Sequence, residues 1–211
     1  MFLTMLMVGF FSPYLLAQQK NDVLQQLQAK LTDSEQRNQA ISAGMDRALL
    51  CGYCHGSDGN SIRSEVPNLA GQNPDYLLQQ VNHFSTGERK DFVMNSLASK
   101  FTLDDQINLT IFYASQEVKP VYVNRVRASK GKPIYIQRCQ SCHGETGRGN
   151  TGYARLAGQQ TDYIKMTLLR FRENAKGKST DHRRRSEIME SLSASLTDQE
   201  IQNLAAYISS M

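Results

Sequence analysis

The order of apolar and polar positions divides the chain into an apolar N-terminal stretch and a long region with helical periodicity. Residues 2–17 carry no charged side chain, whereas polar residues dominate from Gln18 onward. Beyond that point no stretch alternates apolar and polar residues as a half-buried strand does, so the pattern predicts an all-α protein. Two predicted helices, within residues 18–38 and 76–84, show the helical spacing of apolar side chains: Leu24, Leu27 and Leu31, and Leu77, Val81 and Phe84.

Two further helices, starting near residues 102 and 197, are predicted from their N-cap residues. Thr102 is followed three residues later by Asp105, and Thr197 by Glu200. In such a capping box the hydroxyl and the carboxylate satisfy backbone N–H groups that the first helical turn leaves unpaired.

The chain repeats itself. Cys51-Gly-Tyr-Cys54-His55-Gly is answered 88 residues later by Cys139-Gln-Ser-Cys142-His143-Gly. The agreement continues at an offset of 87 and, after eight extra residues, at an offset of 95, so we infer two homologous halves. The matching positions are Leu69-Ala-Gly-Gln72 with Leu156-Ala-Gly-Gln159, Tyr76 with Tyr163, Phe84 with Phe171, and Met94-Asn-Ser-Leu with Met189-Glu-Ser-Leu.

The repeat predicts two tandem domains, residues 39–115 and 129–211, joined by a basic linker over residues 116–128. Residues 18–38 are predicted as a helical extension that braces the first domain, with a partner-binding helix as the alternative. Residues 1–17 are too short for a spanning helix and indicate a signal peptide for export to the periplasm, although no basic residue precedes Lys20. A retained anchor on the periplasmic side of the membrane is the alternative.

Two features of the composition bear on function, the charge and the cysteines. The 211 residues carry a formal net charge of +4, too mild and mixed to indicate nucleic acid as a partner. The charge is polarised, because residues 39–115 hold five basic and eight acidic residues, whereas residues 116–211 hold sixteen and nine. A basic loop over residues 176–185, with Arg183, Arg184 and Arg185, is predicted either as a docking surface for an acidic partner or as a solvated loop.

The four cysteines indicate covalent haem. In Cys-x-x-Cys-His, two thiols form thioethers with the porphyrin vinyl groups and the adjacent histidine reaches the iron. The pattern occurs twice, at Cys51, Cys54 and His55 and at Cys139, Cys142 and His143, which predicts two haem c groups. A thioredoxin-like redox pair, a shared zinc site and two disulfides are the alternatives, but none of them requires histidine directly after both pairs.

A haem that transfers electrons without binding substrate needs a sixth iron ligand, and methionine is the ligand that raises the potential. Beyond the N-terminal segment, only Met94 and Met189 occupy equivalent positions in both halves, and we predict them as ligands. His83 and His182 lack a histidine counterpart and are predicted as surface or locally bonded residues, with replacement of a methionine in one oxidation state as the alternative.

These motifs, together with Pro67-x-Leu69-Ala-Gly-Gln72, resemble the class I c-type cytochromes, and the two-domain arrangement resembles the dihaem cytochrome c4 family. The resemblance covers residues 39–211. It implies two small helical domains, each around one low-spin haem with His and Met ligands. It also implies electron transfer from a quinol-oxidising complex to a haem-copper terminal oxidase or another acceptor.

The resemblance also implies that Pro67 lends its carbonyl to the haem-ligating histidine. Ala154 stands at the equivalent position of the second half, so we expect the two haems to differ in potential. The sequence predicts an electron carrier rather than an enzyme. The alternatives are a cytochrome subunit of a dehydrogenase or respiratory complex, a haem-based sensor, and a dihaem peroxidase, which would need an open iron position.

Overall fold

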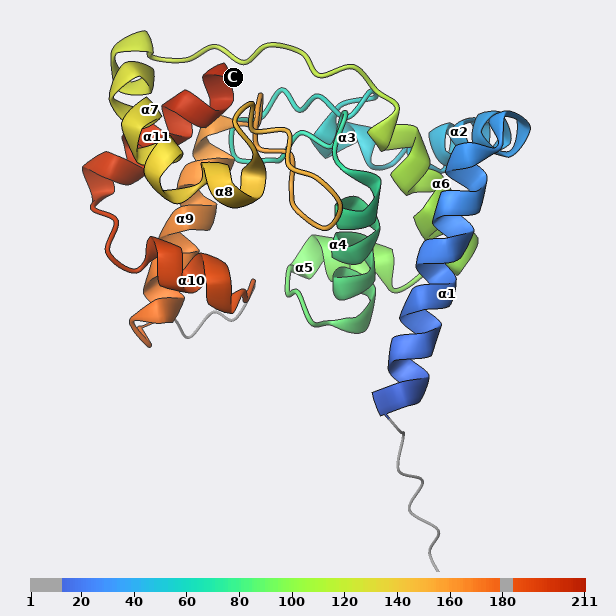
Figure 1. Cartoon of the computed structure of the whole chain (residues 1–211). Coiled ribbons are helices and arrows are strands. Elements are labelled where there is room, and N and C mark those ends of the chain that lie inside the picture. The colour runs from blue at the N-terminus through green and yellow to red at the C-terminus, as the bar shows by residue number, and fades with distance from the viewer. Residues whose placement is uncertain (1–12, 179–183) are drawn as a thin grey trace, which may run out of the picture.

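The computed structural model describes residues 13–178 and 184–211, and this part of the chain is helical, without β-strands. Figure 1 shows two helical domains side by side, with an extended linker that crosses above them from α6 to α7. The second domain repeats the order of the first, helix for helix. The first domain contains α2 (Ser34–Arg47), α3 (Gly52–His55), α4 (Pro74–Thr86), α5 (Phe92–Ala98) and α6 (Leu103–Ala114). The second contains α7 (Arg125–Arg138), α8 (Gln140–His143), α9 (Thr161–Ala175), α10 (Glu187–Ser193) and α11 (Asp198–Ser210).

Both predicted capping boxes are present and start the last helix of each domain. Thr102 accepts the N–H of Asp105 at 3.1 Å while the Asp105 carboxylate accepts the N–H of Thr102 at 2.9 Å. Thr197 and Glu200 exchange the same bonds at 3.2 and 2.8 Å. The start of each terminal helix is therefore set locally, as the sequence predicts.

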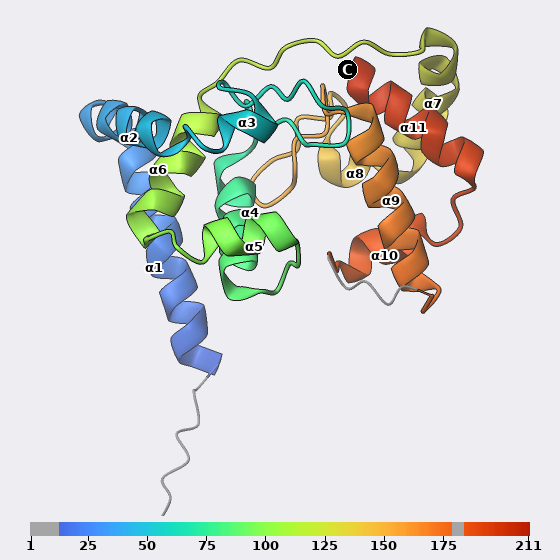
Figure 2. The ribbon, with the colours of Figure 1, turned by 180° about the vertical axis from the view of Figure 1, so that it is seen from behind.

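The helix α1 (Pro13–Thr32) precedes the repeat and runs along the outer side of the first domain (Figures 1 and 2). The predicted apolar face packs onto the domain: Leu27 is fully buried, and Leu24 and Leu31 lie against the same cluster. At its edge Lys30 Nζ binds Asp104 Oδ1 at 2.8 Å. The helix therefore packs against the first domain, and its role as a brace stays a prediction.

Two predicted boundaries differ from the structure. The extension over residues 18–38 is not one helix, because Asp33 accepts the N–H groups of Glu35 and Gln36 at 2.9 Å and so starts α2. The helix α7 starts at Arg125, inside the predicted linker, because Asn124 accepts the N–H of Arg127 at 3.0 Å.

Most of the predicted signal segment, residues 1–17, lies outside the described residues, and its cleavage stays a prediction. Among the helices that the structure describes, none is long and apolar enough to cross a bilayer.

In each domain the first and last helices cross and approach each other at a glycine. A Cβ atom on Gly44 would lie 2.2 Å from the backbone oxygen of Asn108, and one on Gly131 would lie 2.1 Å from that of Asn203. Only glycine allows such an approach of two helix backbones. The two glycines are repeat equivalents, so the same crossing is built twice.

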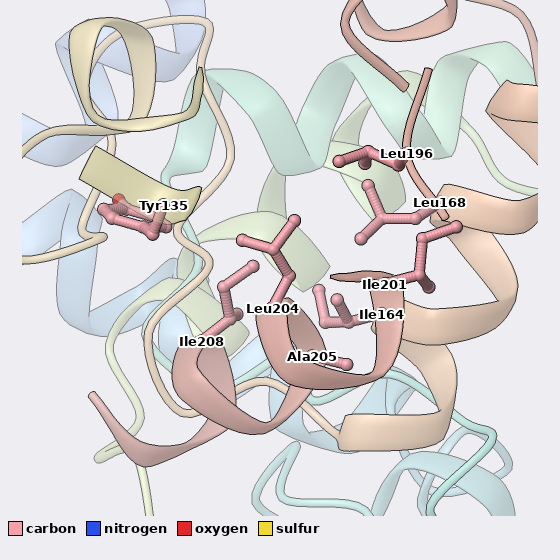
Figure 3. Packing of buried hydrophobic residues seen from close by; sticks show 8 residues of the cluster. All are labelled: Tyr135, Ile164, Leu168, Leu196, Ile201, Leu204, Ala205 and Ile208. Atoms are coloured by element: carbon pink, nitrogen blue, oxygen red, sulfur yellow. The ribbon is translucent and has the colours of Figure 1, made fainter. Parts of the chain in front are cut away.

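Apolar side chains from separate helices fill the second domain below this crossing. Figure 3 shows side chains of α9 and α11 facing one another, with Leu196 and Tyr135 at the edges of the cluster. Met189 and Met211 pack against it from the side. The buried members are Tyr135, Ile164, Leu168, Leu196, Ile201, Leu204, Ala205 and Ile208.

Candidate functional site

The first Cys-x-x-Cys-His segment forms a single helical turn directly after α2. The Cys51 carbonyl accepts the N–H groups of Cys54 at 3.2 Å and His55 at 2.9 Å. The second segment is built in the same way, with Cys142 and His143 bonded to Cys139 at 3.3 and 2.9 Å. One turn therefore places both thiols of a pair and the imidazole on neighbouring positions of one helix face.

All four cysteines are free and half-buried. Burial raises the pKa of Cys139 to about 11, and it also raises the pKa of Cys51. These two thiols are therefore protonated at neutral pH, and an S–H group is what adds across a vinyl double bond when a thioether forms. Within the described residues no three His, Cys, Asp or Glu side chains are grouped to hold a metal ion.

The two histidines are buried, and one ring nitrogen of each is hydrogen-bonded to a backbone carbonyl. His55 Nδ1 lies 2.9 Å from the Pro67 oxygen, and His143 Nδ1 lies 2.9 Å from the Ala154 oxygen. Burial lowers the pKa of both imidazoles, which favours their neutral form. A neutral ring that donates from Nδ1 keeps the Nε2 lone pair for a metal, so the arrangement suits iron ligation.

The carbonyl bond is the same in both domains although proline is absent from the second. Any residue offers a carbonyl, and Ala154 places its own at the same 2.9 Å distance as Pro67 does. What differs is the backbone that carries the carbonyl, because only Pro67 has a fixed φ angle.

The two predicted methionines occupy equivalent positions in short capped helices. In α5 the Met94 N–H donates to the Asp91 carboxylate at 3.0 Å, and in α10 the Met189 N–H donates to the Ser186 hydroxyl at 3.4 Å. Both side chains are half-buried. The other histidine that the structure describes outside the two motifs, His83, has Nε2 3.2 Å from a carboxylate oxygen of Glu88 and is locally bonded, as predicted.

The two domains are joined by a reciprocal pair of glutamine clamps that the sequence reasoning missed. The Gln159 side chain accepts the N–H of Asn68 at 2.7 Å and donates to its carbonyl at 2.9 Å. The Gln72 side chain does the same with Arg155, at 2.6 and 3.1 Å. Gln72 and Gln159 are the last residues of the repeated Leu-Ala-Gly-Gln motif. Their repetition was the feature of the sequence that could have indicated the clamps.

These clamps connect the two candidate centres. Asn68 follows Pro67 and Arg155 follows Ala154, so each clamp holds the residue next to a carbonyl that orients a histidine. The Arg155 guanidinium is buried at this interface and donates to the carbonyls of Ala70 at 2.7 Å and Gly71 at 3.1 Å. Burial lowers its pKa to about 10, so the group keeps its charge at neutral pH.

A second interdomain cluster joins the loops that precede α5 and α10. Arg89 and Arg184, which are repeat equivalents, each donate to the hydroxyl of Tyr163 at 3.2 Å, and Arg184 also donates to that of Tyr76. Burial raises the pKa of Tyr163, but the two guanidinium groups outweigh burial and lower it to about 7.

This cluster removes Arg184 from the exposed part of the basic loop, whose role in docking stays a prediction. Arg184 points inward, where it bonds Tyr163 and lies 5.2 Å from the centroid of the Phe171 ring. Arg185 pairs with Glu190 at 2.8 Å. Arg183 and His182 lie outside the described residues. Of the loop's described basic residues, Lys176 and Lys178 are exposed.

Comparison with known proteins is consistent with this geometry. The family model for cytochrome c matches residues 128–211. Cytochrome c4 of Azotobacter vinelandii is 32% identical over 186 residues, which cover 79% of this chain and 87% of that protein. The crystal structure of reduced recombinant cytochrome c4 from Pseudomonas stutzeri matches with a TM-score of 0.71 at 28% identity, covering 81% of this chain and 98% of that one.

A more distant relative is the thiosulfate dehydrogenase electron acceptor of Stutzerimonas stutzeri, 25% identical over 180 residues, which cover 78% of this chain and 80% of that protein. The two Cys-x-x-Cys-His segments fit the covalent attachment of two haem groups, one in each domain. The chain belongs to the cytochrome c4 family.

Proposed function

We propose that this protein is a dihaem electron carrier of the periplasm that passes electrons from a quinol-oxidising complex to a haem-copper terminal oxidase or another acceptor. The observation that carries the proposal is the twofold occurrence of one arrangement: a cysteine pair and a buried histidine with Nδ1 already bonded. Two such centres in one chain suit one-electron transfer between partner proteins.

Each residue has one task in this proposal. Cys51 and Cys54 would hold the first haem through thioethers, and His55 Nε2 and Met94 Sδ would bind its iron. Cys139, Cys142, His143 and Met189 would do the same in the second domain. When bound, each haem supplies an iron that accepts and releases one electron.

The chain's own groups prepare these sites. The carbonyls of Pro67 and Ala154 hold each imidazole in one orientation and keep the proton on Nδ1. The caps Asp91 and Ser186 fix the turns that carry the methionines. The clamps at the interface keep the two centres in a fixed relation, and burial limits the access of water to both histidines.

The experiment uses the full protein, exported by a host that attaches haem. The intact mass counts the covalent haems, and the oxidised spectrum shows whether a Met–iron charge-transfer band is present. We expect two low-spin haems. Met94→Leu and Met189→Leu should each remove about half of the band and lower one of the two potentials, since methionine is the ligand that raises potential.

Met166→Leu is the matched control, because Met166 lies within α9 and has no methionine counterpart in the first domain. It should leave the band and both potentials unchanged. A high-spin haem in the unmodified protein that binds carbon monoxide would contradict the carrier and favour an enzyme or a sensor.

A cytochrome subunit of a dehydrogenase is the second candidate, favoured by the similarity to the thiosulfate dehydrogenase electron acceptor. The two candidates differ in the electron donor. Stopped-flow reduction by a purified quinol-oxidising complex, compared with reduction by a purified thiosulfate dehydrogenase, separates them by rate.

A further inference from the structure

The helix that carries Met189 is anchored at its start by a buried carboxylate. Glu190, which directly follows Met189, is 7% exposed. Its Oε1 atom accepts the N–H of Ser186, the N-cap residue of α10, at 3.1 Å. Arg185 donates to the same atom through Nε at 2.8 Å, and the amide of Asn174 lies at 3.4 Å from it. The carboxylate thus ties the loop before α10 to the end of α9.

In the first domain the equivalent position is Asn95, which directly follows Met94. Its Oδ1 atom accepts the N–H of Asp91, the N-cap residue of α5, at 2.6 Å. Its amide nitrogen donates to the carbonyls of Phe84 at 2.5 Å and Arg89 at 2.8 Å. One neutral amide therefore ties the loop before α5 to the end of α4.

The second domain divides this task between two side chains. Asn174 donates to the Arg184 carbonyl at 2.8 Å, and Arg184 is the repeat equivalent of Arg89. Of the three kinds of bond that Asn95 makes, Glu190 makes only the one to the N-cap N–H. Both anchors bond the N-cap N–H, but the residue after Met94 is the neutral Asn95 whereas the residue after Met189 is the charged Glu190.

The charge of Glu190 is only partly balanced by its partner. The Glu190 side chain is 9% exposed, whereas the Arg185 side chain is 53% exposed. Water and salt screen an exposed charge more strongly than a buried one, so Arg185 offsets the charge of Glu190 only in part. The equivalent residue after Met94 is the neutral Asn95. The N-caps differ in the opposite sense, because the Asp91 carboxylate accepts the Met94 N–H whereas the neutral Ser186 hydroxyl accepts that of Met189.

We propose that Glu190 is a positioning residue for the Met189 loop and that its carboxylate lowers the reduction potential of the second centre. This inference rests on the proposed function, in which Met189 binds the second iron. Reduction adds an electron to the centre, and a negative charge fixed nearby disfavours that step. The difference between Asn95 and Glu190 is thus one of the charge differences that set the potentials of the two sites.

The test is Glu190→Gln in the full haem-loaded protein. Glutamine keeps an oxygen for the Ser186 N–H but removes the charge. We expect the potential of the second haem to rise, that of the first to stay, and the Met–iron band to persist. Glu187→Gln is the matched control, because Glu187 lies in the same helix, is exposed, and undergoes the same change of charge. A Glu190→Gln shift no larger than the control shift would overturn the inference.

Asn95→Asp gives the reciprocal test in the other domain and does not depend on whether the Glu190 variant folds. Because it also removes the N–H groups that bond Phe84 and Arg89, it is compared with Asn95→Leu, which removes them without adding charge. Asn95→Asp should lower the potential of the first haem alone, and an unchanged potential would count against the proposed effect of charge. Glu190→Ala, which removes the anchor, should weaken the Met–iron band of the second haem. Absence of that band in the unmodified protein would overturn both proposals, whereas its presence with equal Glu190→Gln and Glu187→Gln shifts would overturn only this one.

Discussion

Replacing Gly131 with alanine tests whether the contact of α7 with α11 holds the second domain together. A Cβ atom at this position would lie 2.1 Å from the Asn203 oxygen, 2.6 Å from the Asn203 carbonyl carbon and 2.8 Å from Tyr207 Cβ. Heavy atoms in contact are normally about 3.5 Å apart, so the helices must separate by more than about 1 Å. Backbone atoms cannot move aside as a flexible side chain can.

The expected loss follows from two opposing effects. Overpacking of a close helix contact costs about 3 kcal/mol at the upper end of its usual range. Alanine is the better helix former and returns about 1 kcal/mol. We therefore expect Gly131→Ala to lower the free energy of unfolding by about 2 kcal/mol, and Gly44→Ala to do the same in the first domain.

The assay is denaturant unfolding of the haem-loaded protein, followed both by far-ultraviolet circular dichroism and by haem absorbance. Ser129→Ala is the control, because Ser129 is exposed on the same helix and its replacement should change stability by less than about 0.5 kcal/mol. If Gly131→Ala proves as harmless as Ser129→Ala, the close crossing does not hold the domain together.

Three other predictions concern the interface and the two centres. Gln159→Ala and Gln72→Ala each leave a buried backbone N–H and carbonyl without partners, which should lower the free energy of unfolding by about 2 kcal/mol. Proteolysis of the linker should then become faster, and an unchanged cleavage rate would show that the clamps do not hold the domains together. The pKa of Tyr163 is lowered to about 7 from an ordinary value near 10, so its contribution to stability is complete above pH 10 and is lost as the pH falls through 7. Tyr163→Phe should therefore flatten the rise in stability between those pH values, and an unchanged slope would refute the pKa assignment. Because Pro67 and Ala154 present the same carbonyl from different backbones, a redox titration should resolve two waves, and a single wave would contradict this expectation.

Much of the candidate site could be predicted because its parts are neighbours in the chain. Cys51, Cys54 and His55 lie within one helical turn, so their spacing alone places them together. The N-cap residues Thr102 and Thr197 bond to backbone groups three positions away, so the sequence predicted these caps as well. The repeat then reduced the candidate methionine ligands to one pair, Met94 and Met189, without any knowledge of the fold. Their bond to iron is still a proposal.

Other features depend on segments that meet only after folding. The charge pattern placed Arg184 in a basic loop that was either a docking surface or solvated, but the structure turns it inward onto Tyr163. A run of basic residues does not indicate which of them will find a partner inside the fold. The partition of one anchoring role between Glu190 and Asn174 was likewise hidden, since the two residues are sixteen positions apart and join through the packing of α10 on α9.

The sequence by itself determined the helical class, the duplication, the attachment motifs and the starts of the last helix in each domain. All of these depend on side-chain periodicity or on hydrogen bonds within a few residues, which local backbone geometry sets. Only the tertiary structure decided how the halves meet, through Gln72 and Gln159, and where helices touch, at Gly44 and Gly131. Those contacts arise from packing between surfaces that are distant in the chain, where shape and burial rather than residue spacing select the partners.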